Sequence, residues 1–285
     1  MNTDVTECEV KTADGRTLHV YDTGTGDGPA RLTVVWHHGT PNLGAPPEPL
    51  LPASRRLAIR WVSYDRPGYG ASTPLPGRRV GSAAADAACV ADALGVGRFA
   101  VMGHSGGGPH ALACAALLPD RVLGAVSVAG LAPYGAEGLD WFAGMCDSGR
   151  ASLTAAAGGR RAKSRHEAQA AYDPAMFTEA DHAALAGDWS WFEDVVTPAL
   201  AGGPGGLIDD DLAYVDDWDC DPRTITCPVL LLHGGRDRVA PSAHAQWLAD
   251  RCRRSTLRLR PDDGHISVLS GAVDALEWLL RHSMQ

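Results

Sequence analysis

The sequence lacks the usual signs of a metal, disulfide or membrane protein. Its seven cysteines are odd in number and scattered, and none of them forms a Cys-x-x-Cys pair or the ligand spacing of a zinc site. No segment approaches the ~18 uninterrupted apolar residues that a membrane-spanning helix needs. The net charge of −9 argues against nucleic acid or an anionic membrane surface as a main partner. We therefore expect reduced thiols and a small molecule as partner.

Targeting signals are missing as well. Residues 1–8 contain neither a basic stretch nor an apolar one, which is not the pattern of a signal peptide. Together with the scattered cysteines, this predicts a cytoplasmic protein. The chain has 285 residues, of which 45% are hydrophobic and 21% charged, and these values are typical of one large α/β domain with room for an insertion.

Strand-like and helix-like stretches alternate over most of the chain. Such alternation predicts a mostly parallel eight-stranded sheet with helices on both faces, the α/β class. After an opening hairpin over 7–22, the expected strands cover residues 32–36, 59–64, a run starting at 99, 122–129, 229–233 and 257–260. The expected helices cover residues 46–58, 82–94, 110–118, 241–252 and 267–281.

The alternation stops in the middle of the chain. Residues 134–222 contain helix-like pieces and Gly/Pro breaks without a clear strand, so we expect a helical cap inserted into a core domain formed by 1–133 and 223–285. The insertion holds ten of the 18 aromatic residues. Most should build the insertion's own core, and the others should line an apolar pocket. Candidate substrate contacts in this segment are Trp141, Phe142, Trp189 and Trp191.

The sequence changes character abruptly at Ser105. A strand-like run starting at Phe99 ends in Gly-His-Ser-Gly-Gly, and a helical stretch of small residues begins at once. A sharp strand-to-helix turn forces its central residue toward unfavourable backbone angles, and glycines at 103 and 107 remove side chains that would clash. Because the chain has 33 glycines, the pattern alone is weak, and the serine could merely cap a helix. The strand before it and the helix after it favour a nucleophile.

A serine hydroxyl needs a base to take its proton and a third group to orient that base. The loops after the strands at 229–233 and 257–260 carry Asp237 and His265. Both loops should reach the sheet edge at which the serine turn lies. Asp262 and Asp263 compete with Asp237. The acidic run 209–211 is expected to be solvated, as is the basic cluster 160–165, and His244 is expected on a helix surface.

Several of these stretches together resemble the α/β-hydrolase fold superfamily, in its esterase-like branch with a serine nucleophile. They are His38-Gly39-Thr40-Pro41, Asp65-Arg66-Pro67-Gly68-Tyr69-Gly70, Gly103-His104-Ser105-Gly106-Gly107, Gly235-Arg236-Asp237 and Gly264-His265. The resemblance implies that Ser105 is the nucleophile, His265 the general base and Asp237 the group that fixes the imidazole. It also implies an oxyanion hole made by the backbone N–H groups of Thr40 and Gly106. Such a mechanism needs no metal and no organic cofactor.

A serine as the nucleophile limits the reactions that the protein could catalyse. Haloalkane dehalogenases and epoxide hydrolases of this fold need a carboxylate where Ser105 stands, and the loop at 38–41 is not the glycine-richer loop of related peptidases. Serine suits hydrolysis of a carboxylic ester, thioester or lactone, here with an apolar or aromatic acyl part. A carbon–carbon bond hydrolase with the same triad and a non-catalytic binding protein are the alternatives. His104 is a further candidate substrate contact, and a homodimer is left open.

Overall fold

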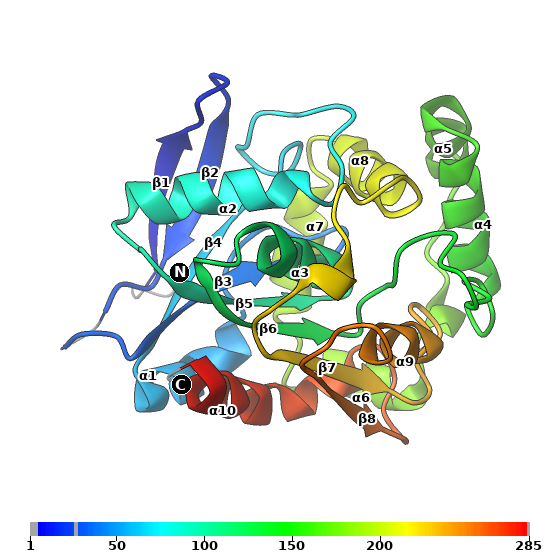
Figure 1. Ribbon diagram of the computed structural model, residues 1–285. Coiled ribbons are helices and arrows are strands. Elements are labelled where there is room, and N and C mark those ends of the chain that lie inside the picture. The colour runs from blue at the N-terminus through cyan, green and yellow to red at the C-terminus, as the bar shows by residue number, and fades with distance from the viewer. Residues whose placement is uncertain (1–4, 26–27, 284–285) are drawn as a thin grey trace.

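The computed structural model describes residues 5–25 and 28–283, so part of the signal-peptide expectation, on residues 1–4, lies outside the described residues. Eight strands form one sheet in the order β1-β2-β4-β3-β5-β6-β7-β8 (Figure 1). The pairs β1/β2 and β2/β4 are antiparallel, and all the others are parallel. The strands are β1 (Thr6–Lys11), β2 (Thr17–Asp22), β3 (Leu32–His37), β4 (Ile59–Tyr64), β5 (Phe99–His104), β6 (Val122–Val128), β7 (Val229–Gly234) and β8 (Ser255–Arg260).

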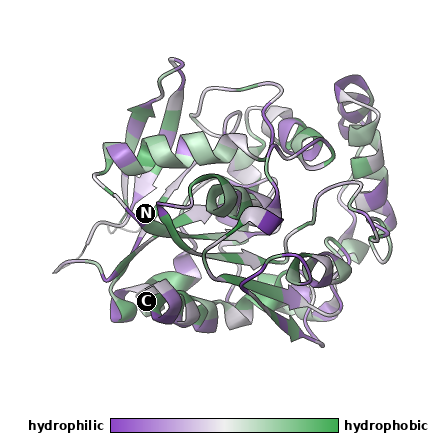
Figure 2. Cartoon of the chain, viewed as in Figure 1, coloured by the Kyte–Doolittle hydropathy of each residue, from purple (hydrophilic) through white to green (hydrophobic). Residues whose placement is uncertain are grey.

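Helices cover both faces of the sheet because the central strands β3 to β7 are buried on both sides. One apolar cluster joins the sheet to α2 (Ser82–Ala93), α3 (Gly107–Leu117) and α9 (Ala243–Ala249). A second joins the opposite face to α1 (Leu51–Leu57) and α10 (Ala272–Ser283). The hydrophobic residues, green in Figure 2, accordingly concentrate in the sheet and in α3. The predicted α/β class and sheet are confirmed.

The strand register brings four loops to one edge. In the parallel pairs His37 lies opposite Gly103, Val128 lies opposite His104, and Gly234 lies opposite Arg260. The carboxyl ends of β3, β5, β7 and β8 therefore meet at the same edge of the sheet. The loops that follow these strands contain Thr40, Ser105, Asp237 and His265.

The segment between β6 and β7 is helical, and the described structure places no strand in residues 134–222. Its helices are α4 (Asp147–Ala157), α5 (Arg160–Glu167), α6 (Glu179–Ala186), α7 (Phe192–Ala199) and α8 (Gly205–Tyr214). Short 3₁₀ turns lie at Glu48–Leu50, Pro174–Met176, Pro222–Thr224 and Ser267–Gly271. Helices α4 and α5 pack on each other and on α8, to the right in Figure 1, while α7 packs into the second apolar cluster. Among the described helices none is long and apolar enough to cross a membrane.

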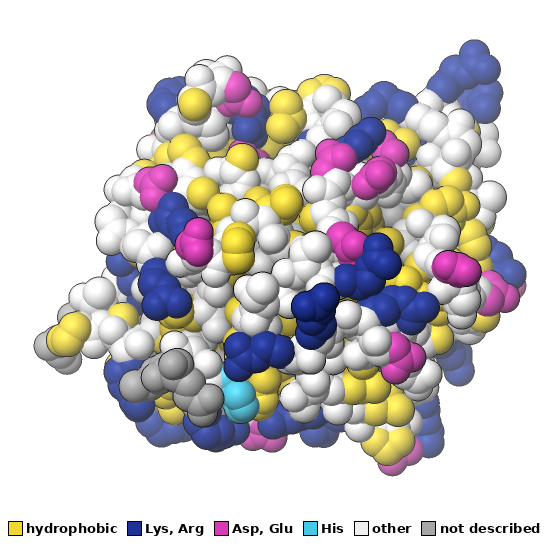
Figure 3. All heavy atoms as spheres, in the orientation of Figure 1, with side chains coloured by type: hydrophobic (Ala, Val, Ile, Leu, Met, Phe, Trp, Pro, Cys, Tyr) yellow, Lys and Arg dark blue, Asp and Glu magenta, His cyan; other side chains and the backbone are white. Residues whose placement is uncertain are grey.

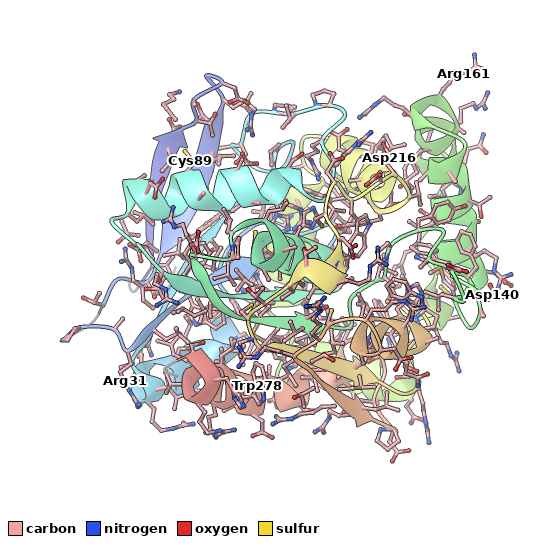
Figure 4. The ribbon with its side chains drawn as sticks, viewed as in Figure 1. Arg31, Cys89, Asp140, Arg161, Asp216 and Trp278 are labelled. Carbon is pink, nitrogen blue, oxygen red and sulfur yellow. The ribbon has the colours of Figure 1, made fainter. Side chains whose placement is uncertain are left out.

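The expectations about the basic cluster and about His244 are wrong. The basic cluster at 160–165 is only partly solvated: Arg161 is exposed at the tip of α5 (Figure 4), but Lys163 is fully buried between Glu167 and Asp211. His244 is also buried, and its Nδ1 accepts the N–H of Ala132 in place of water. Periodicity cannot detect either case, since the partners lie far away in the sequence. Elsewhere, side chains of both signs are interspersed on the viewed surface (Figure 3).

Candidate active site

Ser105 occupies a strained turn between β5 and α3. Its φ is +54°, in the left-handed region that side chains avoid, and its N–H donates to the carbonyl of Val128 at 2.8 Å. A Cβ on Gly103 would overlap the backbone of Gly107, and a Cβ on Gly107 would overlap the carbonyl of His37. The two glycines are therefore required by close backbone approach. The serine is half-buried and lies at the start of a helix, where free N–H groups gather.

Asp237 and His265 form a buried pair at the ends of β7 and β8. The Nδ1 of His265 lies 2.7 Å from Oδ2 of Asp237. A neutral His265 that donates from Nδ1 carries its lone pair on Nε2, the atom that would take a proton from a serine. Asp262 and Asp263, the alternatives to Asp237 as the partner of the histidine, instead form ion pairs: Asp262 with Arg236 and Asp263 with Arg260.

The surroundings keep Asp237 ionised. Its Oδ1 accepts the N–H groups of Val239 and Ala240 at 2.8 and 2.9 Å. Burial alone would raise the pKa of this carboxyl, but the nearby His265 and the hydrogen bonds from His233 and His265 outweigh burial and lower it far below its ordinary value. The carboxylate therefore has a fixed orientation and a stable negative charge facing the imidazole.

His104 lies next to this pair. Its ring centroid is 5.0 Å from that of His265, and its Nε2 donates to the His265 carbonyl at 3.0 Å. Burial lowers the pKa of His104 to about 3, so the ring is neutral. Phe192 packs against the ring at 5.6 Å. The observed contacts of His104 are thus with His265 and Phe192, and its role as a substrate contact stays a prediction.

Thr40 and Gly106 are brought together from β3 and α3. A Cβ added to Gly106 would overlap the hydroxyls of Thr40 and Tyr214, so the three residues are in close contact. The Thr40 hydroxyl lies 2.7 Å from that of Tyr214 and donates to Asp210 at 2.5 Å. With the hydroxyl engaged in this way, the backbone of Thr40 is held beside the turn at Ser105.

Asp210 is the centre of a buried ionic network beneath this loop. It is fully buried and lies 2.6 Å from Nη2 of Arg66 and 2.7 Å from Nη1 of Arg78. The Arg66 guanidinium also donates to the carbonyls of His38 and Gly39. Burial opposes ionisation, but the two guanidinium groups hold the pKa of Asp210 well below its ordinary value.

The prediction of a solvated acidic run was therefore wrong. All three carboxylates are buried, each with its own basic partner: Asp209 pairs with Arg160, Asp210 with Arg66 and Arg78, and Asp211 with Lys163. The sequence signal that could have indicated this is the Asp-Arg-Pro-Gly stretch at 65–68, whose Arg66 needs a counter-ion once it is buried.

The aromatic residues predicted to contact substrate fall into two groups. Trp141 and Phe142 pack edge to face at 5.0 Å, and the Trp141 ring also contacts that of His244 at 5.2 Å. Trp189 and Trp191 pack on Phe192 in the second apolar cluster. The three indoles are buried, and Phe142 is partly exposed.

Buried neutral histidines surround the site. Burial lowers the pKa of His37 and His104 to about 3 and that of His244 to about 4. Burial also holds the pKa of His38 and His110 well below the ordinary value of 6.5. In the folded protein these histidines therefore stay neutral at a pH at which the same side chains would bind a proton in the unfolded chain.

Acid is therefore expected to destabilise the protein well before carboxylates titrate. A histidine whose folded pKa is lowered contributes full stability above its unfolded pKa of 6.5 and loses it as the pH falls toward the folded pKa. Each proton taken up on unfolding lowers the free energy of unfolding by about 1.4 kcal/mol per pH unit. Urea unfolding at a series of pH values checks this, and a midpoint unchanged between about pH 7 and about pH 5 would contradict it.

A family model described as alpha/beta hydrolase fold matches residues 33–272. The chain belongs to the α/β hydrolase fold family. Among curated proteins, a non-heme chloroperoxidase from Streptomyces lividans is 35% identical over 126 residues, which are 44% of this chain and 45% of that protein. The match thus spans less than half the length of that relative.

Solved structures of α/β hydrolases resemble nearly the whole chain. A thermophilic esterase from Thermogutta terrifontis has a TM-score of 0.71 and 22% identity, covering 98% of this chain and 100% of that one. An enol-lactonase from Burkholderia xenovorans LB400 has a TM-score of 0.70 and 20% identity, covering 96% and 100%. An esterase from Exiguobacterium antarcticum has a TM-score of 0.66 and 21% identity, covering 98% and 100%. At such identities these similarities show the fold.

Proposed function

We propose that this α/β hydrolase is a serine hydrolase that cleaves a small carboxylic ester, thioester or lactone through an acyl-enzyme. The observation that carries the proposal is the φ of +54° at Ser105, in a turn at the sheet edge that also bears the Asp237–His265 pair. Strained backbone of this kind clusters at active sites. A serine that only capped a helix would not need a base and an acid in the neighbouring loops.

In the proposed reaction the Ser105 oxygen attacks the carbonyl carbon and its proton passes to Nε2 of His265. Asp237 stabilises the resulting imidazolium through Nδ1. The N–H groups of Thr40 and Gly106 stabilise the negative oxygen of the tetrahedral intermediate. His265 then protonates the leaving alcohol. A water molecule hydrolyses the acyl-enzyme by the reverse sequence, releasing the acid and returning the proton to Ser105.

The similar proteins support this chemistry at the level of substrate class. Two of the solved structures are esterases and one is an enol-lactonase, and both kinds of substrate contain an ester-type carbonyl. We propose further that the segment 134–222 is a cap that covers the site. Its cluster of Tyr134, Trp141 and Phe142 would supply part of an apolar acyl pocket, since Tyr134 and Phe142 are partly open to solvent.

The substrate class is tested with p-nitrophenyl esters of increasing acyl length and with an aryl ester. An apolar pocket is expected to raise kcat/KM with each added methylene, by roughly fourfold from the ~0.8 kcal/mol that burial of a CH₂ contributes, until the pocket is full. Phe142→Ala should flatten this increase, because it removes apolar surface from the proposed pocket. A strict preference for acetate would contradict the apolar pocket.

A further inference from the structure

The loop that carries His265 is fastened by one side chain from the helical insertion. Oδ1 of Asp181, on α6, accepts the N–H groups of Ile266 and Ser267, both at 2.8 Å, and the Ser267 hydroxyl at 2.9 Å. The Ser267 hydroxyl in turn accepts the N–H of Gly264 at 2.7 Å. Asp181 Oδ1 therefore satisfies the two N–H groups that follow His265, and through the Ser267 hydroxyl it is linked to the N–H that precedes it.

The Asp181 carboxylate lies close to the backbone of Gly264, and the sequence provides a glycine at that position. A Cβ on Gly264 would overlap the Asp181 carboxylate, so a glycine is required directly before His265. Asp181 is only 1% exposed. Burial would raise its pKa, but the N–H groups of Ser267, Thr178 and Ile266 outweigh burial and lower it, which keeps the carboxylate ionised.

The two oxygens of Asp181 have separate partners. Oδ2 accepts the N–H and the hydroxyl of Thr178, both at 2.9 Å, and the Thr178 hydroxyl accepts the N–H of Asp181 at 3.2 Å, so the two residues form the capping box of α6. Oδ1 serves only the loop at 264–267. Helix capping and loop attachment can therefore be removed one at a time.

We infer that Asp181 is a positioning residue, which holds the backbone of His265 so that its imidazole stays hydrogen-bonded to Asp237 and available as the base for Ser105. This inference rests on the proposed function. The Asp237 carboxylate fixes the ring of His265 and His104 fixes its carbonyl, but neither holds the N–H groups that follow it. The insertion thereby completes the geometry of the proposed base as well as covering the site.

Three variants separate this role from ordinary stabilisation. Asp181→Ala removes both sets of bonds, and we expect kcat on a p-nitrophenyl ester to fall by about 10- to 100-fold with KM unchanged, because small displacements of a reacting group are costly. Asp181→Asn keeps an oxygen for the loop but loses the capping box, and should retain kcat within about threefold. Thr178→Val removes the capping hydroxyl alone and should lower the urea midpoint while leaving kcat within about twofold.

The inference is overturned if Asp181→Ala retains the wild-type kcat, if Asp181→Asn is as slow as Asp181→Ala, or if Thr178→Val loses as much kcat. Should Asp181→Ala not fold, Ser267→Ala removes only the hydroxyl that bridges Asp181 and Gly264, and it leaves the N–H bonds of Ile266 and Ser267 to Asp181 in place. That variant should lower kcat by about threefold at constant KM, because part of the loop's attachment is lost, and no change would count against the inference. Failure of the proposed function looks different, because the wild-type protein would then show no hydrolysis that depends on Ser105.

Discussion

Replacing Ser105 by alanine is expected to lower kcat for ester hydrolysis by about 10⁴- to 10⁶-fold while KM changes little. The hydroxyl supplies the bond-forming atom, whereas the groups that would bind the carbonyl, the N–H donors of Thr40 and Gly106, remain in place. A small residual rate is expected for that reason. Because alanine is smaller than serine and φ is already positive at this position, the fold should tolerate the change.

The matched control is Ser164→Ala. Ser164 is exposed on α5, which contributes no residue to the proposed triad or oxyanion hole. Its kcat should stay within about twofold of the wild type, because surface substitutions rarely change stability by more than ~0.5 kcal/mol. Steady-state kinetics on both variants, with circular dichroism to check folding, decide the matter. A Ser105→Ala protein with more than a tenth of the wild-type kcat would rule out the proposed nucleophile.

The second large effect is expected at Asp210. Asp210→Asn leaves the guanidinium groups of Arg66 and Arg78 buried without a counter-ion, which should cost about 3–5 kcal/mol of unfolding free energy. Activity should fall as well, because Arg66 and Thr40 lose the group that ties the loop at 38–41 to α8. The pKa of Asp210 lies below its ordinary value, so this stability is present above about pH 4 and is lost in stronger acid.

The neighbouring residue offers the comparison. Asp209 pairs with Arg160, whose side chain is 45% exposed, so Asp209→Asn leaves behind a guanidinium group that solvent can still reach. We expect that variant to lose less than about 1 kcal/mol. Urea unfolding of both variants measures the difference. Equal losses at 209 and 210 would contradict the account of the buried network.

The sequence predicted those parts of the site that depend on local geometry. The turn at Ser105 needs glycines two residues away on each side, and that requirement is visible in any window of five residues. The loops with Asp237 and His265 follow strands whose direction the alternation pattern implies. For the same reason the sheet, its helices and the helical character of 134–222 could be predicted.

The parts that could not be predicted depend on contacts between distant segments. Asp181 meets the loop at 264–267 some 85 residues later in the chain, and Asp210 meets Arg66 across 144 residues. Asp181 stands in a capping box with Thr178, a pattern that indicates the start of a helix and no contact with a distant loop. Asp210 stands in an acidic run, which on its own is typical of a solvated surface. Lys163 and His244 were misjudged for the same reason: burial of a polar side chain is decided by partners that sequence spacing does not identify.

The central claim is that Ser105 is an activated nucleophile. The most direct measurement is mass spectrometry of the whole protein after treatment with a fluorophosphonate, followed by peptide mapping. The account predicts one adduct per chain, on Ser105, no adduct on Ser105→Ala, and much slower labelling of His265→Ala, because the base is then missing. No adduct on the wild-type protein, or an adduct on another residue, would contradict it.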